Sequence, residues 1–385
     1  MTERARWQVI VAGIAALVLS VGLARFSYTP MLPLMLDQTS LTKLQGGWLA
    51  TLNYTGYLAG AILASVLPRL YDKFVLYRVG LITALVTTPA MGVTQDLGLW
   101  LVLRFVSGVS STAGLLLASG LIMNWLANRG QKTELGLHFA GMGLGIALTG
   151  ALVLGLHPAL DWAAQWYAMG LIGVLCFIPA WFWMPPPAQA ASRAPLATTS
   201  PEAPTGRWMR LMLAAYLFSG FGYVISATFI VDILEEFPSL QGLGNWAWVL
   251  VGAAAIPSTF VWDKVAARWG DFQALLLAYG IQWVSIVLPL VSDQWWAGLL
   301  SALLYGGTFV GIVSLTLSIT GRRFPANPAK AMARMTISYG IAQIVAPALA
   351  GFIAQASGSY RGSLLLAAAC VAIGMIILDR LRKHP

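Results

Sequence analysis

Two arginines lie inside long apolar stretches of the sequence. Arg25 interrupts the apolar run from Trp7 to Met35, and Arg104 lies within the run 98–127. A guanidinium keeps its proton at physiological pH, and placing it inside a bilayer is costly unless water, a carboxylate or an anion compensates the charge. We therefore expect both arginines to face a polar cavity, where two cations attract an anionic ligand. The alternative for Arg104 is structural: its guanidinium caps backbone carbonyls of adjacent helices or extends outward.

Polar and aromatic side chains recur at helical spacing in the segments that would line this cavity. Residues three, four or seven apart share one face of a helix, and tyrosine combines apolar area with a hydroxyl, which suits an amphipathic organic ligand. Hydrogen bonding between helices is the alternative for each of them. Besides the two arginines, the candidate ligand-binding residues are Tyr28, Asn53, Tyr57, Tyr216, Tyr223, Thr228, Tyr305, Tyr339 and Gln343.

Candidate proton-carrying groups are few, because no Asp or Glu lies in the middle of an apolar segment. His138 lies one helical turn after Glu134, and histidine titrates near neutral pH; an ordinary surface pair is the alternative. Asp232 lies near the end of the segment 209–233 and could pair with Arg25 or Arg104 to close one side of the cavity. The alternative for Asp232 is an ordinary acid at the membrane interface.

The elements that must position these residues are apolar segments about twenty residues long. The chain has 385 residues, of which 58% are hydrophobic and 10% charged, whereas a soluble protein carries about a quarter charged residues. Segments of this length cross a bilayer as helices, and the first is too long for a signal peptide. The twelve segments span residues 8–35, 46–67, 75–95, 98–127, 135–157, 162–184, 209–233, 243–262, 272–291, 295–320, 331–356 and 361–380.

A Pro-, Ala- and Ser-rich stretch, 185–208, divides the segments six and six and is interpreted as a cytoplasmic linker between the bundles 1–184 and 209–385. If the N-terminus is cytoplasmic, the loops on the outer side of the membrane contain only two basic residues, Lys43 and Arg361. With Arg25 and Arg104 inside segments, the remaining 19 of the 23 Lys and Arg residues (23 − 4) lie on the cytoplasmic side. This asymmetry supports twelve spans with both termini cytoplasmic. The net charge of +9 is thus explained by topology and contact with anionic lipids, not by nucleic-acid binding.

An offset of 198 residues relates the two halves. It connects the same residue types in the first, second and fourth segments of each half: Gly22 with Gly220, Trp48 with Trp246, and Gly108 with Gly306. We therefore expect an all-α membrane protein with two parallel six-helix halves and a site between them. Cys176 and Cys370 lie in apolar segments and the three histidines do not cluster, so neither a disulfide framework nor a metal or other cofactor is predicted.

Three strings resemble the YbfB/YjiJ group of the major facilitator superfamily. They are GLARFSYTPMLPLM at 22–35, GWLATLNYTGY at 47–57 and GFGYVISATF at 220–229. The resemblance extends over essentially the whole chain. It implies the superfamily fold, a multi-pass location in a bacterial inner membrane, and transport by rocking of two halves about a central site.

The resemblance also concerns residues at the cytoplasmic loops and in the fourth segment. Asp72 and Lys73 match the acidic–basic pair of the superfamily's loop between helices two and three, which acts as a cytoplasmic latch, but the glycines of that motif are missing. In the second half, Ala267 stands where the motif has Asp. Arg104 followed by Gly108 matches an Arg-x-x-x-Gly element that is linked with proton coupling in many members.

Together these features predict a monomeric secondary active transporter. The predicted substrate is a small organic anion that binds at Arg25, and an amphipathic anion is included in this prediction. Proton symport, anion exchange and facilitated diffusion stay open, as does the direction of transport. A multidrug or metabolite exporter of the same superfamily is the alternative, although cationic drugs favour a buried acid that the central segments lack. No Ser-His-Asp grouping, metal cluster or nucleotide motif favours an enzyme.

Overall fold

The computed structural model describes residues 3–130, 136–157, 159–187, 206–324 and 328–383, and within these ranges it contains helices and their connections without a strand. Glu134 and most of the predicted linker lie outside the described residues. The helices are α1 (Glu3–Leu17), η1 (Val18–Phe26), α2 (Tyr28–Gln38), α3 (Lys43–Val66), α4 (Leu70–Ala90), α5 (Leu97–Thr112), η2 (Ala113–Leu117), α6 (Ala118–Ala127), α7 (Gly136–Leu156), α8 (Trp162–Phe182), α9 (Gly206–Glu235), α10 (Asn245–Trp269), α11 (Asp271–Val291), α12 (Trp295–Arg323), α13 (Pro328–Ser357) and α14 (Arg361–Lys383).

These helices make twelve membrane-length rods, as predicted. Eleven are long and apolar enough to span a bilayer, and two of these are composite: α1–η1–α2 forms the rod Glu3–Gln38, and α5–η2–α6 forms Leu97–Ala127. The twelfth is α4, whose 21 residues include Asp72, Lys73 and Arg78. The predicted all-α membrane fold is therefore confirmed.

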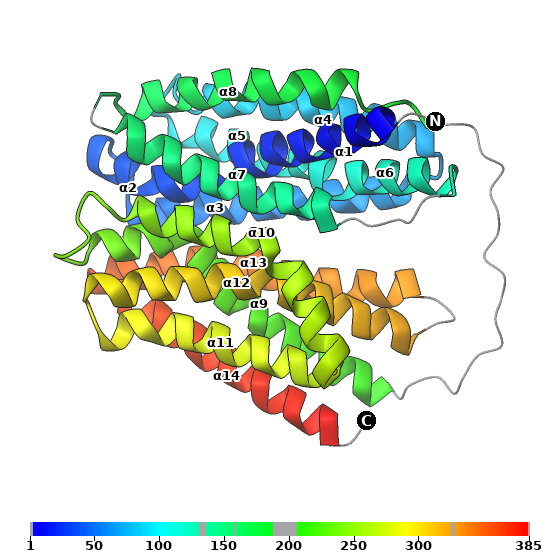
Figure 1. Cartoon of the computed structure of the whole chain (residues 1–385). Helices are drawn as coiled ribbons and strands as arrows, with labels where there is room; N and C mark the ends of the chain where they lie inside the picture. The colour runs from blue at the N-terminus through cyan, green and yellow to red at the C-terminus, as the bar shows by residue number, and fades with distance from the viewer. Residues whose placement is uncertain (1–2, 131–135, 158, 188–205, 325–327, 384–385) are drawn as a thin grey trace.

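The twelve rods form two bundles that lie side by side (Figure 1). Helices α1 to α8 make the N-terminal half, and α9 to α14 make the C-terminal half. The starts of α1 and α9 and the ends of α8 and α14 lie at the same end of the molecule, which we call the terminal end. The other end is called the opposite end below. At the interface, α3 packs on α13 and α7 packs on α10.

Equivalent glycines produce equivalent helix contacts in the two halves. A Cβ added to Gly108 would lie 2.0 Å from the carbonyl oxygen of Asn53, and one added to Gly306 would lie 2.3 Å from that of Val251. Asn53 and Val251 are themselves related by the 198-residue offset (53 + 198 = 251). Only glycine allows helix backbones to approach this closely. The internal repeat is therefore present in the packing as well as in the sequence.

Glycines also bring the two halves together. A Cβ at Gly47 of α3 would lie 2.4 Å from the carbonyl oxygen of Pro347 in α13. A Cβ at Gly143 of α7 would lie 2.7 Å from the carbonyl oxygen of Gly252 in α10. Small residues at both contacts let the halves pack backbone to backbone, which suits helices that slide or tilt on one another.

Candidate functional site

Arg25 is buried in an aromatic cage near the middle of the molecule. Its side chain is 5% exposed, and its guanidinium carbon lies 4.6 Å from the ring centroid of Tyr54 and 4.5 Å from that of Tyr57. Among the described residues, no carboxylate lies within 4.0 Å of it and its Nε has no hydrogen-bond partner. The aromatic faces compensate the charge only in part, so the Arg25 charge has no ionic partner among the described residues.

Arg104 is also buried, but backbone carbonyls accept from both of its terminal nitrogens, while its Nε has no partner. Its two terminal nitrogens donate to the carbonyl oxygens of Ala24 at 3.1 Å and Arg25 at 3.2 Å, and its guanidinium carbon lies 4.5 Å from the ring centroid of Tyr28. This is the capping arrangement named above as the structural alternative. Arg104 therefore holds the turn that carries Arg25.

The local sequence explains why these carbonyls need an outside donor. Residues Val18–Phe26 form a π-helix, and the Ser27 N–H bonds five residues back to the Gly22 oxygen at 2.9 Å. Pro30 lies five residues after Arg25 and has no N–H to donate to the Arg25 carbonyl. The change from π to α spacing and the proline together leave carbonyls in this turn without regular helical partners.

The other N-terminal candidates support this arrangement. The Asn53 side-chain amide donates to the Arg104 carbonyl at 2.9 Å and to the Ser107 hydroxyl at 2.8 Å, which ties α3 to α5. The Tyr28 hydroxyl donates to the Gly46 carbonyl at 2.9 Å. Asn53 and Tyr28 thus have structural partners, whereas Tyr57 presents its ring to Arg25.

The C-terminal half contributes an aromatic wall that contains four of the predicted residues. Tyr216 stacks on Tyr339 with ring centroids 4.4 Å apart, and Tyr339 lies 5.4 Å from Tyr223. The Tyr305 hydroxyl donates to the Tyr223 carbonyl at 3.0 Å, whereas the buried Tyr339 hydroxyl has no partner. Phe309 completes the wall, 5.6 Å from Tyr223. The structure therefore brings these predicted tyrosines into one cluster.

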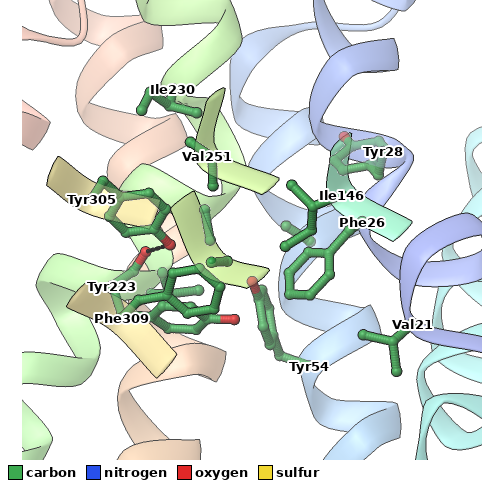
Figure 2. Packing of buried hydrophobic residues seen from close by; sticks show 14 of the residues in the cluster. Val21, Phe26, Tyr28, Tyr54, Ile146, Tyr223, Ile230, Val251, Tyr305 and Phe309 are labelled. Atoms are coloured by element: carbon green, nitrogen blue, oxygen red, sulfur yellow. Dashed lines mark hydrogen bonds between the residues drawn. The ribbon is translucent and has the colours of Figure 1, made fainter. Parts of the chain in front are cut away.

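Arg25 and Tyr223 occupy equivalent positions in the two halves (25 + 198 = 223). Figure 2 shows Tyr54 of the N-terminal half between Phe26 on one side and Tyr223 and Phe309 on the other. One turn along the same helices, the Thr29 hydroxyl donates to the Ala227 carbonyl, which is another pair related by 198 residues. The site therefore lies on the pseudo-twofold axis, with a cation on one side and tyrosines on the other.

Tyr54 and Phe309 were not among the predicted residues. Tyr54 lies three residues before Tyr57, and Phe309 lies four residues after Tyr305, so helical spacing from a chosen tyrosine was a signal for both. Thr228 and Gln343, which were predicted, are buried, and the Thr228 hydroxyl has no partner.

The predicted coupling residues other than Arg104 lie apart from the arginines. His138 is buried in α7, with Nε2 3.0 Å from the Ser119 hydroxyl. In the described part of the chain, Asp72 and Lys73 form no ion pair. In the second half, Asp271 at the start of α11 pairs with Arg322 at the end of α12 at 2.6 Å. No group of three or more His, Cys, Asp or Glu residues suited to a metal occurs in the described ranges.

Asp232 does not pair with Arg25 or Arg104 in this structure. It lines a cavity of about 520 Å³ at the opposite end, between α2 and the start of α3 on one side and the end of α9 and the start of α10 on the other. Across the interface there, Lys43 of α3 forms a salt bridge with Glu236, which directly follows α9. The halves therefore contact each other at this end of the interface.

Known proteins share this fold over nearly their full length. The chain is 22% identical over 377 residues to a hexuronate transporter of Bacillus subtilis (strain 168), covering 90% of this chain and 88% of the relative. The crystal structure of the nucleoside transporter NupG superimposes with a TM-score of 0.77 at 12% identity, covering 99% of this chain and 100% of NupG. A bacterial homologue of the human lysosomal transporter Spinster gives a TM-score of 0.72 at 15% identity, covering 100% and 98%.

The names of these relatives describe transporters, and the transporter family that matches the chain confirms the prediction that it is not an enzyme. The family described as "Uncharacterised MFS-type transporter YbfB" matches residues 17–379. That match confirms the resemblance stated from the three sequence strings. The chain belongs to this YbfB-type family of the major facilitator superfamily, and it is a multi-pass membrane transporter.

Proposed function

We propose that the protein is a secondary active transporter for a hexuronate-like organic anion, a sugar acid with one carboxylate and several hydroxyls. The observation that carries the proposal is the buried Arg25 guanidinium, which has no carboxylate partner among the described residues. A carboxylate ligand would supply that partner in the bidentate geometry that arginine favours. The hexuronate transporter relative supports the same class of solute.

The rest of the site suits the rest of such a ligand. Across from Arg25, the rings of Tyr223 and Phe309 offer flat apolar surface to the C–H face of a sugar ring. The unpartnered hydroxyls of Tyr339 and Thr228 offer hydrogen bonds to sugar hydroxyls. The carboxylate would thus bind in the N-terminal half and the polyol in the C-terminal half.

Transport would proceed by rocking of the halves about this site. The Lys43–Glu236 pair and the Thr29–Ala227 hydrogen bond join the halves towards the opposite end, so exchange with solvent in this conformation would be from the terminal end. The excess of Lys and Arg at the terminal end supports a cytoplasmic location for that end in a bacterial cell. We therefore infer an inner-membrane protein in which this state is closed to the outside.

Thermal stabilisation of the purified protein tests the proposal. A ligand at 100 times its Kd adds about 2.7 kcal/mol to the native state, so glucuronate and galacturonate should raise the Tm. Glucose and galactose, which have a hydroxymethyl group in place of the carboxylate, should not. In Arg25→Ala the shift should vanish.

Arg78→Ala is the matched control, because Arg78 also lies over aromatic rings, 4.7 Å from Phe74 and 4.4 Å from Trp181, but in α4 away from the site. It should keep the hexuronate shift. Equal stabilisation by the neutral sugars, or a hexuronate shift that survives Arg25→Ala, would contradict the proposal.

A further inference from the structure

The cavity at the opposite end is strongly acidic. Its charged lining consists of Lys43 and four carboxylates, Asp37, Asp232, Glu235 and Glu236, and His157 is its remaining ionisable residue. Lys43 and the four carboxylates sum to −3 (1 − 4) when all four acids are ionised and to −2 (1 − 3) when Asp232 is protonated. Such a field repels an organic anion and concentrates protons and cations.

Three of the four carboxylates have an evident structural place. Glu235 accepts hydrogen bonds from the N–H groups of Gly242 at 2.6 Å and Gly244 at 2.7 Å, which fixes the turn before α10. Glu236 forms the salt bridge with Lys43. Asp37 is exposed to solvent. Contacts account for the charges of Glu235 and Glu236, and exposure to solvent accounts for that of Asp37.

Asp232 differs from the other three acids. Its side chain is 7% exposed, its Oδ2 has no hydrogen-bond partner, and within the described residues no cation lies within 4.0 Å of it. The buried hydroxyl of Tyr360 interacts with the Asp232 carboxyl without reaching regular hydrogen-bond geometry. Burying an ionised carboxylate without a partner is strongly unfavourable, and the group takes up a proton instead. Burial at the opposite end therefore favours protonation of Asp232 more than exposure to solvent would.

The binding of an anion at Arg25 changes this balance. Asp232 lies nine residues (232 − 223) after Tyr223 on α9, which is roughly 14 Å of helix. Arg25 and Arg104 have no carboxylate partner among the described residues, and the charges that act directly on Asp232 are Lys43, Glu235 and Glu236. At a separation like that of Tyr223 from Asp232 and an effective dielectric constant of 20, cancelling one positive charge lowers the preference for the ionised form about sevenfold. Anion binding thus promotes proton binding.

We propose that Asp232 binds the proton that this transporter moves together with its anion. The inference rests on the proposed anion function. The acidic cavity supplies the proton when the opposite end is open, and closure buries the neutral acid. The unpartnered hydroxyl of Thr228, one turn along the same face of α9 towards Arg25, is the next polar group on the way to the terminal end.

Several charged and titratable groups act on Asp232. They are Lys43, Glu235, Glu236 and Tyr360 around it, Tyr28 from the N-terminal half, and Asp37 and His157 in the cavity lining. Lys43 is already paired with Glu236. His138 belongs to a different place, in α7 against Ser119, and does not line the cavity.

Proton uptake on ligand binding tests the inference. Glucuronate is added to purified protein in weakly buffered detergent solution containing a pH indicator. Because linkage is reciprocal, the wild type should take up protons as it binds, and its affinity should rise as the pH falls. Asp232→Asn, which imitates the neutral acid, should bind glucuronate with no proton uptake. Asp37→Asn, a carboxylate of the same cavity, and His138→Gln should behave as the wild type.

In liposomes, the same variants separate coupling from transport. Asp232→Asn should lose at least tenfold of pH-gradient-driven glucuronate uptake but keep the exchange of labelled for unlabelled glucuronate at equal pH. Retained proton uptake in Asp232→Asn, or wild-type uptake driven by a sodium gradient at equal pH, would overturn the inference.

The wild type decides the outcome even if Asp232→Asn does not fold. Glucuronate binding without proton uptake overturns this inference and leaves the proposed function intact. A wild type that binds no hexuronate at all overturns both.

Discussion

The guanidinium of Arg104 donates hydrogen bonds to the carbonyl oxygens of Ala24 and of Arg25, at 3.1 and 3.2 Å. One buried arginine thus holds the main chain of the other. Asn53 in turn binds the Arg104 carbonyl. Three helices of the N-terminal half therefore converge on the turn that carries Arg25, which fixes its side chain before a ligand arrives.

Replacing Arg104 should separate positioning from ligand binding. Arg104→Met removes two charge-assisted hydrogen bonds to the backbone and should lower stability without ligand by about 3 kcal/mol, in addition to weakening glucuronate binding. Arg104→Lys, which keeps the charge without the planar fork, should also lower the ligand-free Tm. Arg25→Ala, by contrast, should abolish binding and leave the ligand-free Tm near that of the wild type. A ligand-free Tm unchanged in Arg104→Met would contradict this role.

Equivalent glycine substitutions should show whether the repeat carries equivalent packing. A Cβ at Gly108 or Gly306 would lie 2.0 or 2.3 Å from a backbone oxygen, so each Gly→Ala change should destabilise the protein by about 1–3 kcal/mol or more. Gly120 of α6 has nothing within 4 Å of an added Cβ, and Gly120→Ala should be neutral or slightly stabilising. Thermal unfolding in detergent compares the three. Similar losses at Gly120 and Gly108 would show that close packing is not the cause.

The fold could be predicted because its determinants are local. Twenty-residue apolar segments, the Lys and Arg distribution and the 198-residue offset can all be read along the chain. The charge of Arg25 inside an apolar segment was equally visible, and it remains the centre of the candidate site. Each of these signals can be read without knowing which helices touch one another.

The partners of the site residues could not be predicted, because they depend on which faces of different helices meet. Arg104 binds backbone carbonyls that are freed by a π-helix, and no sequence pattern used here indicates that irregularity. Asp232 was a candidate partner for either arginine, with an ordinary interfacial acid as the alternative, and α9 places it at the opposite end. His138 was a candidate proton carrier, with a surface pair as the alternative, and the approach of Gly13 in α1 buries its ring.

Two tyrosines of the aromatic wall should respond differently to loss of their hydroxyls. The Tyr305 hydroxyl donates to the Tyr223 carbonyl, so Tyr305→Phe should cost about 1 kcal/mol of stability. The buried Tyr339 hydroxyl has no partner, so Tyr339→Phe should leave ligand-free stability unchanged or raised. If that hydroxyl binds a sugar hydroxyl, Tyr339→Phe should weaken glucuronate binding about tenfold, measured by calorimetry. Unchanged affinity in Tyr339→Phe would remove this residue from the site.

The salt bridge between Lys43 and Glu236 should control opening at the opposite end. Lys43 also lies 4.5 Å from the ring centroid of Tyr360, so it contacts the other half twice. The two side chains are 26% and 34% exposed, and a pair of this kind contributes at most about 1 kcal/mol. Lys43→Glu replaces attraction with repulsion and should shift the population towards an open opposite end.

Spin labels at the exposed residues Ser40 and Ser239, with Cys176 and Cys370 replaced, report the separation of the halves. Lys43→Glu should lengthen the label distance in a larger fraction of molecules, and adding Glu236→Lys should restore the wild-type distribution, because the swapped pair attracts again.

Arg361→Glu is the matched control for this gate, because Arg361 is a basic residue at the same end whose bond goes to Leu290 within its own half. It should leave the label distances unchanged. An equal change of the label distances in Arg361→Glu would assign the effect to net charge. If Lys43→Glu combined with Glu236→Lys stayed open, the Lys43–Glu236 pair would not be what holds the halves together. Restoration by the swap alone identifies the pair as the contact that closes the opposite end.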